Sequence, residues 1–454
     1  MDLADKKVVV IGLGKRTGIA AAEFLIEQKA EVLVSDIKPA KDLQDELEEL
    51  SEYDIDFDLG GHGSKVIDDT DLIVISPGVP SDIPILKEAR HLGIPVISEI
   101  ELAYRFCKAP IMAITGTNGK TTTTTLTGEM FTAAKEEVKV RGNIGDPLIE
   151  DITSLSDKGV VVAEISSFQL ENIQYFRPKI SLILNLTPDH LNRHGTFENY
   201  IAAKKKIFFN QQKSDYTVLN YDDELTRKLA NETEGQVIYF SRHDKLNNGV
   251  YVENGKIINN LTADNESLIK IDETGIKGPH NLENALGAVT IALLGGINLG
   301  VIQKVLKEFS GIEHRIEEVA VIEGIKYIDD SKATNPAAAI KALETFAAPI
   351  TLIAGGMDKN ADLTEFAVKI AEKVQNLILL GETAEKIKES VSNLGLDNIK
   401  QVKAIDEAVR VAEKISVKGD IVLLAPGCAS WDMFDSYKQR GNEFKKEVMN
   451  LRRK

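Results

Sequence analysis

The sequence has few of the residues that mark several large classes of protein. Only two cysteines, Cys107 and Cys428, occur in 454 residues, which excludes a disulfide framework and favours a reducing compartment. Basic residues are outnumbered, with 54 Lys+Arg against 70 Asp+Glu and a net charge of −16. Neither nucleic acid nor an anionic membrane is therefore expected as the main partner, and any anionic ligand must be held by local groups.

Long apolar runs are also missing. The longest uncharged stretch, from Ala285 to Ile302, is broken by Gly295, Gly296 and Asn298, which predicts a helix, a turn and a second helix instead of a membrane span. The first residues, "MDLADKKVVVIG", include acids and too short an apolar run for a signal peptide. We therefore expect a cytoplasmic protein with no membrane insertion, and we expect it to act as a monomer.

What the sequence does contain is a regular alternation of strands and helices. Short β-branched runs such as "KVVVIG", "DLIVIS", "PIMAIT", "VVVAEI" and "DIVLLAP" are separated by helical segments. This pattern predicts an α/β fold with mostly parallel sheets, in which ligands bind beyond the carboxyl ends of the strands. Hairpins are expected in "DKLNNGVYVENGKIINN", at the edge of the middle unit, and in "EEVAVIEGIKYIDD".

The length predicts about three domains. We place the boundaries near residues 98 and 311. The predicted units are a Rossmann-like domain over 1–98, a central ATP-binding domain of the P-loop type over 99–311, and a second Rossmann-like domain over 312–454.

A glycine turn between a strand and a helix, "PIMAITGTNGKTTTTT", predicts a nucleotide phosphate site. Glycines let backbone N–H groups approach phosphate oxygens, a lysine meets the outer phosphates, and a hydroxyl can ligate Mg²⁺. The usual pattern begins about five residues before the Gly-Lys pair, whereas here the first glycine is three before it. The alternative is a plain strand-helix turn with a capping threonine. The predicted phosphate-binding residues are Gly116, Thr117, Asn118, Gly119, Lys120, Thr121 and Thr122.

A lysine lies in the centre of an apolar helical stripe in "FENYIAAKKKIFF", which predicts a helix over 197–209. At helical spacing, Lys204 lies among Phe197, Tyr200, Ile201 and Phe208. Burying an ammonium ion without a partner is costly, so this position needs an explanation. One alternative is that the stem packs while the charged head reaches water.

Several segments resemble motifs of the Mur ligase family, in the same order and over nearly the whole chain. They are "GTNGKTTT", "GNIG", "EISSFQLE", "LNLTPDHLNRHGTFENYIAAK", "GPHNLENALGA", "EHRIE", "DDSKATNP" and "APGCASWDMFDSYKQRGNEF". The resemblance implies an ATP-dependent ligase that joins an amino acid to a carboxylate. The last motif and the Rossmann-like first unit favour the members that join D-glutamate to UDP-N-acetylmuramoyl-L-alanine.

The resemblance also implies a metal and carbamate centre. Two Mg²⁺ ions would be held by Thr121, Glu164, His190 and a carbamylated Lys204, and the catalytic residues would be Lys120, Glu164, His190 and Lys204. A lysine whose charge is disfavoured by apolar packing has a lowered pKa, so that its neutral amine can capture CO₂. His194 would be a structural neighbour of this centre.

The remaining ligand contacts are implied in the same way. The ATP contacts beyond the phosphate loop would be Asn284, Arg315 and Asp330. The UDP-substrate contacts would be Gly14, Thr17, Asp36, Gly78, Asn143 and His190. The D-glutamate contacts would be Lys332, Thr334, Lys359, Ser430 and Tyr437. Trp431 is interpreted as a core aromatic residue.

Three other functions stay open from the sequence. Gly12, Gly14 and Gly18 form a turn that suggests a nicotinamide oxidoreductase, but their spacing is one residue longer than the dinucleotide fingerprint. A folylpolyglutamate synthetase would share the phosphate loop and require a folate substrate. A non-catalytic sensor of nucleotide or cell-wall precursor would bind without turnover.

Overall fold

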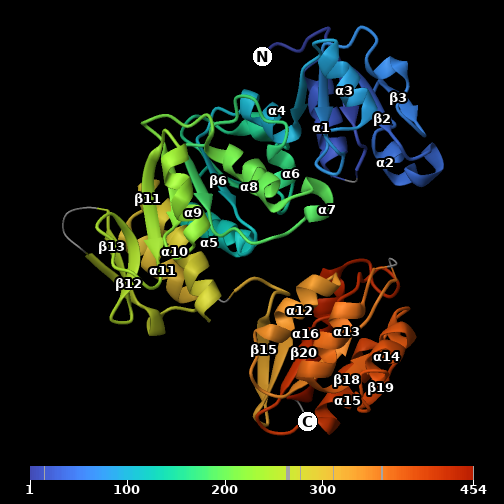
Figure 1. Cartoon of the computed structure of the whole chain (residues 1–454), viewed down its shortest axis with the longest axis vertical. Coiled ribbons are helices and arrows are strands. Elements are labelled where there is room, and N and C mark those ends of the chain that lie inside the picture. Colours follow the sequence, from blue (N-terminus) through green and yellow to red (C-terminus); the bar gives the residue numbers. More distant parts are fainter. Residues whose placement is uncertain (15, 262–265, 277, 310, 359–360, 453–454) are drawn as a thin grey trace. The chain divides into compact units, whose positions relative to one another are not determined.

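The computed structural model describes the chain except residues 15, 262–265, 277, 310, 359–360 and 453–454, and it contains three sheets flanked by helices (Figure 1). The chain divides into two compact units, Met1–Ser310 and Gly311–Lys454, and the first unit contains two of the sheets. Most strand pairs are parallel, which confirms the predicted α/β class with three Rossmann- or P-loop-like parts. The boundaries near residues 98 and 311 stay predictions.

The first sheet is wholly parallel and has the order β3-β2-β1-β4-β5. Its order reverses between β1 and β4, so a ligand crevice is expected beyond the carboxyl ends of these two strands. The strands are β1 (Lys7–Ile11), β2 (Glu31–Asp36), β3 (Ile55–Leu59), β4 (Leu72–Ile75) and β5 (Val96–Ser98). The helices are α1 (Thr17–Glu27), α2 (Gln44–Glu49), α3 (Pro84–His91) and α4 (Glu99–Phe106).

The second sheet has the order β14-β13-β12-β11-β10-β9-β6-β8-β7. It is parallel from β7 to β12, and β12, β13 and β14 pair antiparallel, which confirms the predicted edge hairpin. Its strands are β6 (Ile111–Thr115), β7 (Val138–Gly142), β8 (Val160–Glu164), β9 (Ile180–Ile183), β10 (Tyr216–Asn220), β11 (Gln236–Ser241), β12 (Gly249–Glu253), β13 (Lys256–Asn260) and β14 (Glu266–Lys270). Its helices are α5 (Lys120–Thr132), α6 (Ser167–Leu170), α7 (Leu191–His194), α8 (Phe197–Lys205), α9 (Glu224–Lys228), α10 (Pro279–Leu294) and α11 (Leu299–Glu308).

The third sheet, in the second unit, has the order β15-β16-β20-β17-β18-β19. The predicted hairpin is present as the antiparallel pair of β15 (Glu317–Ile322) and β16 (Ile325–Asp329). The other strands are β17 (Ile350–Ala354), β18 (Val374–Leu379), β19 (Ile399–Gln401) and β20 (Ile421–Leu424). The helices are α12 (Pro336–Glu344), α13 (Thr364–Lys373), α14 (Ala384–Ser392), α15 (Ile405–Ile415) and α16 (Tyr437–Leu451). Separate apolar clusters cover the two faces of this sheet.

A buried carboxyl group joins the first two sheets. Glu99 is the first residue of α4 and is 1% exposed. Its Oε1 accepts a hydrogen bond from the backbone N–H of Ile149 at 2.6 Å, whereas Oε2 is buried without a hydrogen-bond partner among the described residues. Burial is the largest cause that raises the pKa of Glu99, to about 7.

Replacing Glu99 with glutamine is expected to flatten the dependence of stability on pH. Because the folded-state pKa of Glu99 is raised, the folded protein binds the proton more tightly than the unfolded chain. Stability is therefore lost as the pH rises from the unfolded pKa of about 4.3 to the folded value of about 7. Tm, measured by calorimetry, should therefore fall more for the natural protein than for Glu99→Gln as the pH is raised between these two values. The exposed Glu88→Gln variant serves as the control, and parallel curves for all three proteins would contradict the expectation.

Candidate active site

Three strand ends of the second sheet meet at one edge. In the sheet order, β6 lies between β8 and β9, and all three are parallel. The glycine loop follows β6, Glu164 is the last residue of β8, and the segment that contains His190 follows β9. The sheet order therefore places the predicted phosphate loop between the two other predicted groups.

The phosphate loop has the backbone that its glycines allow. Gly116 has φ +152° and Gly119 has φ +81°. Gly119 is the residue that caps α5, so the loop leads directly into a helix N-terminus that favours an anion. Lys120 folds its Nζ back onto the carbonyl oxygens of Gly116 and Thr117, each at 2.9 Å. Thr121 and Thr122 follow in the first turn of α5.

Neighbouring side chains fix this loop from two directions. The Thr117 hydroxyl lies 3.0 Å from the Tyr200 hydroxyl, and the Asn118 N–H donates to Asn185 Oδ1 at 2.8 Å. An ideal Cβ added to Gly119 would lie 2.0 Å from Asn284 Oδ1, so Asn284 packs directly against the loop. Asn185 was not predicted, and the only signal for it was its place just after β9.

Lys204 lies buried inside the centre, 2% exposed. Its Nζ donates to the Gly116 carbonyl at 2.8 Å and to Thr115 Oγ1 at 3.3 Å, and it lies 4.8 Å from the centre of the Tyr200 ring. Burial, followed by the charge of Lys120, holds the pKa of Lys204 well below its usual value. The alternative in which the head reaches water is therefore wrong. The helix itself ends at Lys205, and a 3₁₀ turn from Lys206 to Phe208 follows it, so the prediction of one helix to residue 209 was too long.

Glu164 is 2% exposed and contacts a second predicted residue. Its Oε1 accepts a hydrogen bond from Asn143 Nδ2 at 2.6 Å, whereas Oε2 is buried and has no hydrogen-bond partner among the described residues. The next residue, Ile165, accepts a hydrogen bond from the Thr115 hydroxyl that also contacts Lys204. One buried threonine therefore contacts both the Lys204 amine and the backbone carbonyl that directly follows Glu164.

The two histidines near this edge have different surroundings. His190 has φ +51°, precedes α7, and packs its ring 4.8 Å from the ring of Phe168, with Nε2 3.7 Å from Asp189 Oδ2. His194 lies against Ser167, with Nε2 3.0 Å from Oγ, and burial is the largest cause that lowers its pKa. His190 is the more exposed of the two, so it is the one that a ligand can reach from solvent.

The glycine turn of the first sheet is held by the acid that follows β2. Asp36 accepts hydrogen bonds from the N–H of Leu13 at 2.7 Å and of Lys38 at 2.8 Å. Gly18 packs so tightly that a Cβ would lie 2.3 Å from the Gly12 carbonyl, which fits the helix–strand contact expected of a third glycine in spite of the longer spacing. Gly14 has open space around its Cα.

The other two predicted residues of this crevice lie on its rims. Thr17 is the first residue of α1, and Gly78 belongs to the turn after β4. Both turns adjoin the reversal point of the sheet.

In the second unit, several predicted residues cluster beyond β16 and β20. The Asp330 N–H donates to the Leu424 carbonyl, and burial raises the pKa of Asp330 to about 7, partly offset by the charge of Arg315. Lys332 Nζ lies 5.3 Å from the centre of the Tyr437 ring.

Thr334 and Ser430 lie on adjoining loops, because the Gly427 N–H donates to the Ala333 carbonyl. Ser430 is 2% exposed, and its carbonyl accepts from the N–H of Phe434 at 2.9 Å. Lys359 lies outside the described residues. The interpretation of Trp431 as a core residue is wrong, since this side chain is 63% exposed.

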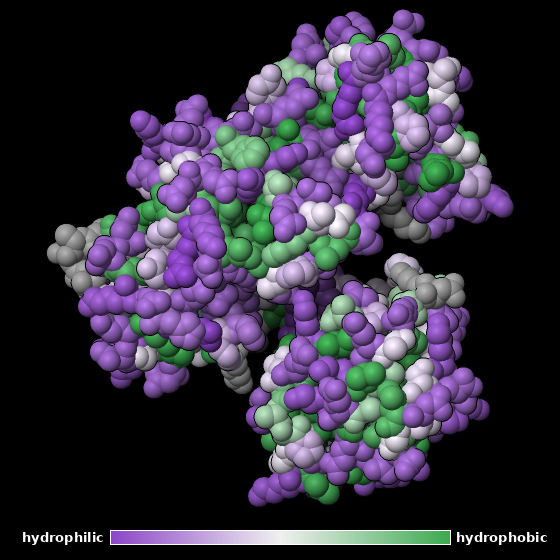
Figure 2. All heavy atoms as spheres, in the orientation of Figure 1, coloured by the Kyte–Doolittle hydropathy of each residue, from purple (hydrophilic) through white to green (hydrophobic). Residues whose placement is uncertain are grey.

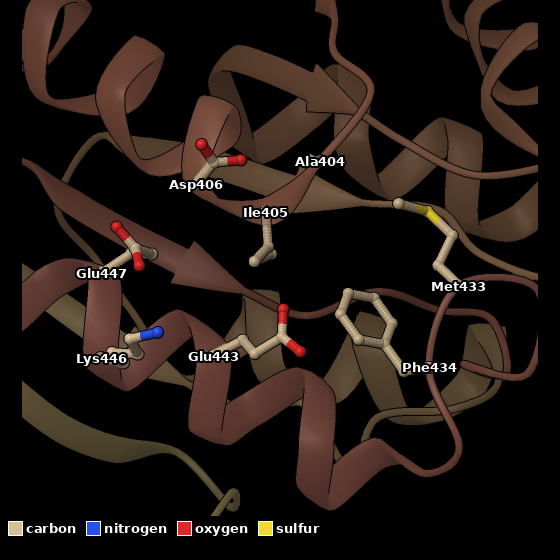
Figure 3. Close-up of a pocket in the computed structure, with 8 residues that line it drawn as sticks. All are labelled: Ala404, Ile405, Asp406, Met433, Phe434, Glu443, Lys446 and Glu447. Atoms are coloured by element: carbon tan, nitrogen blue, oxygen red, sulfur yellow. The ribbon is translucent and has the colours of Figure 1, made fainter.

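A separate hollow of about 420 Å³ opens between the start of α15 and α16, and none of the predicted site residues lines it (Figure 3). Figure 2 shows hydrophilic residues over most of the face in view, with hydrophobic residues in smaller patches. Among the described residues, no helix has both the length and the hydropathy that crossing a membrane requires.

Comparison with known proteins links all three parts of the chain to one family. Family models match residues 6–98 as the "Mur ligase MurD-like, N-terminal domain", residues 114–292 as the "Mur ligase middle domain", and residues 314–428 as the "Mur ligase, glutamate ligase domain". The chain is 49% identical over 455 residues to the UDP-N-acetylmuramoylalanine–D-glutamate ligase of Thermoanaerobacter pseudethanolicus, with 100% of both chains covered. It is 48% identical over 454 residues to the ligase of the same name from Clostridioides difficile, again with 100% of both covered.

Solved structures share the fold at low sequence identity. A UDP-N-acetylmuramate-alanine ligase from Thermotoga maritima matches with a TM-score of 0.57 and 21% identity, over 98% of this chain and 99% of that chain. A UDP-N-acetylmuramoyl-L-alanyl-D-glutamate–2,6-diaminopimelate ligase matches with a TM-score of 0.57 and 18% identity, over 85% of this chain and 93% of that chain.

Proposed function

The chain belongs to the Mur ligase family, and we propose that it joins D-glutamate to UDP-N-acetylmuramoyl-L-alanine at the expense of ATP, in the synthesis of peptidoglycan precursors. The observation that carries the proposal is the 49% identity of this chain, over the whole of both chains, to a UDP-N-acetylmuramoylalanine–D-glutamate ligase. The buried amine and carboxylate beside the phosphate loop add physical support, because a plain strand-helix turn would not require them.

The reaction begins with phosphoryl transfer. The γ-phosphoryl group moves from ATP to a carboxylate oxygen of the alanyl end, which gives ADP and an acyl phosphate. The N–H groups at the start of α5 and the Lys120 ammonium hold the phosphates where negative charge is concentrated. Asn284, Arg315 and Asp330 are proposed as further contacts to the nucleotide.

Family membership implies Mg²⁺ as well as ATP. The residues present fit a hard cation, because the Oε2 of Glu164 is buried without a hydrogen-bond partner among the described residues and oxygen ligands suit Mg²⁺. Thr121, Glu164, His190 and modified Lys204 are proposed to hold two ions. When bound, Mg²⁺ neutralises charge on the transferring phosphoryl group.

Lys204 is proposed to act as a carbamate. The amines of Lys120 and Lys204 donate to the same Gly116 carbonyl, so the charge of Lys120 disfavours a second positive charge on Lys204. A lowered pKa leaves the Lys204 amine neutral, so its nitrogen can attack CO₂ with loss of a proton. The resulting anion would be attracted to the Lys120 ammonium.

The second step forms the amide. The D-glutamate amine attacks the acyl carbon, phosphate leaves, and the amine loses a proton. Lys332, Thr334, Lys359, Ser430 and Tyr437 are proposed to hold the amino acid, since two carboxylates need cationic and hydroxyl partners. Gly14, Thr17, Asp36 and Gly78 are proposed to hold the UDP group, and Asn143 and His190 the muramoyl-alanine arm.

Phosphate release from ATP is expected to require both substrates. With UDP-N-acetylmuramoyl-L-alanine, Mg²⁺ and bicarbonate present, D-glutamate should start release, whereas L-glutamate, lysine or no amino acid should give at most about a hundredth of that rate. A colorimetric phosphate assay makes the measurement. Release without dependence on D-glutamate would contradict the proposal, and ATP binding without release would support the non-catalytic sensor.

We also propose that the chain acts as a monomer in the bacterial cytoplasm, divided into domains near residues 98 and 311. The small number of cysteines, both of them free, supports a reducing compartment.

A further inference from the structure

We propose that Arg193 is a positioning residue that fixes the turn after β4, in the first sheet, relative to the His190 segment of the second sheet. The inference rests on the proposed function, because only the UDP substrate has to reach both places. Arg193 lies three residues after His190, at the end of the sequence "HLNR". Its partners in the first sheet lie more than a hundred residues earlier, as the separation of 114 residues between Arg193 and Val79 indicates.

The guanidinium group of Arg193 forms charge-assisted hydrogen bonds with both the turn after β4 and a carboxylate of the second sheet's domain. Its Nη2 donates to the Val79 carbonyl at 2.7 Å, and Nη1 donates to the Gly78 carbonyl at 3.4 Å. On its own side, Nε and Nη2 donate to the two carboxylate oxygens of Glu171 at 3.2 and 2.8 Å. The ring of Phe168 packs 5.2 Å from the guanidinium carbon. The planar guanidinium group has several N–H donors in a fixed arrangement, so it can contact the two carbonyls and the carboxylate at the same time. The single ammonium group of a lysine cannot do this.

Both ends of this contact adjoin ligand-binding parts. An ideal Cβ on Gly12 would lie 2.6 Å from Val79 Cγ2, so the turn held by Arg193 touches the glycine turn of the crevice. At the other end, Phe168 also packs against the His190 ring. Movement of Arg193 would therefore change the spacing between the UDP turn and the histidine that is proposed to hold metal and substrate.

Other polar groups hold the Glu171 carboxylate in place. The Ser81 hydroxyl donates to its Oε2, and Asn172 Nδ2 donates to Ser81 Oγ at 2.9 Å. Arg90 donates to the Ser81 carbonyl at 2.6 Å and to Asn172 Oδ1 at 2.8 Å. The side chains of Arg193 and Glu171 are only 17% and 15% exposed, so salt screens this pair less than a surface pair.

The test compares Arg193→Ala and Arg193→Lys with the natural enzyme. The matched control is Arg177→Ala, which removes an arginine–carboxylate pair with Asp215 inside the second sheet. For Arg193→Ala, KM for the UDP substrate should rise about tenfold, while KM for ATP stays unchanged. Arg193→Lys should recover little of this loss, and Arg177→Ala should keep both KM values.

A shortened substrate separates positioning from general stability. N-acetylmuramoyl-L-alanine 1-phosphate lacks the uridine and one of the two phosphates of the UDP substrate, so it gains less from the turn after β4. With this substrate, the natural enzyme and Arg193→Ala should differ by less than about twofold in kcat/KM. An equal loss with both substrates, an equal rise of KM for ATP, or an unchanged KM for the UDP substrate would overturn the proposal.

Two further measurements keep the test decisive. If Arg193→Ala has a much lower Tm, Glu171→Gln replaces it, because this change loosens the guanidinium and keeps the side-chain shape. The same rise in KM for the UDP substrate alone is then expected, and its absence counts against the proposal. If the natural protein does not ligate D-glutamate, the proposed function fails, and calorimetric binding of the UDP substrate still tests the role of Arg193.

Discussion

The Lys204→Ala variant is expected to lose at least about a thousandfold in ligation rate while its fold stays intact. The loss follows because the variant can form no carbamate and so has no anion beside Lys120 and the proposed metal site. The fold should survive because truncation removes an amine whose charged form is already disfavoured by burial. Phosphate release gives the rate, and circular dichroism with a thermal scan gives the fold.

The control for Lys204→Ala is the neighbouring lysine. Lys205→Ala removes an ion pair with Glu232, 2.6 Å long, and leaves the buried site unchanged, so it should keep nearly full activity. A short carboxylate such as acetate, added at high concentration, should restore part of the Lys204→Ala activity, since it can occupy the position of the carbamate. Near-normal activity of Lys204→Ala without any additive would refute the carbamate hypothesis.

The Gly119→Ala variant is expected to lose about a hundredfold in kcat/KM for ATP. A Cβ would lie 2.0 Å from Asn284 Oδ1, and the backbone at φ +81° disfavours any residue with a Cβ. The loop must shift, and its N–H groups then no longer point at the phosphates. ATP titration calorimetry and steady-state kinetics measure the effect.

A double variant tests the cause of the Gly119→Ala effect. Gly119→Ala with Asn284→Ala removes the clash, keeps the backbone strain and also loses the proposed Asn284 contact to the nucleotide. It is therefore compared with Asn284→Ala alone, and the remaining strain should make the double variant bind ATP more weakly than that single variant. Gly300→Ala, at a helix start with no positive φ, is the control and should bind ATP normally. Normal ATP affinity in Gly119→Ala would show that the loop tolerates a side chain there.

Local sequence patterns predicted the fold class well. The β-branched runs and the two hairpins are strong signals because each depends on neighbours in the chain. The order of the strands carries no such signal. That β6 lies between β8 and β9, which brings Glu164 beside the phosphate loop, depends on contacts across the sheet.

Among the site residues, too, those that depend on neighbours in the chain could be predicted, and those that depend on distant contacts could not. The stripe around Lys204 correctly placed this residue on the buried face of its helix, because helical spacing defines the faces of a helix, but it left open whether the charged head reaches water. Trp431 was interpreted as a core aromatic residue, whereas its side chain is exposed on the loop after β20, a position that no local pattern indicated. The contact of Arg193 with the first sheet could not be predicted, since its partners there are two backbone carbonyls, which any sequence provides.

The exposed position of Trp431 gives the molecule a spectroscopic property. The chain contains a single tryptophan, and it directly follows Ser430 on the loop proposed to hold the amino acid. Its indole is 63% exposed, so its emission depends on the polarity around that one loop. Indole fluorescence of the natural enzyme therefore reports on one loop of the second unit, with no label and no background from the other two sheets.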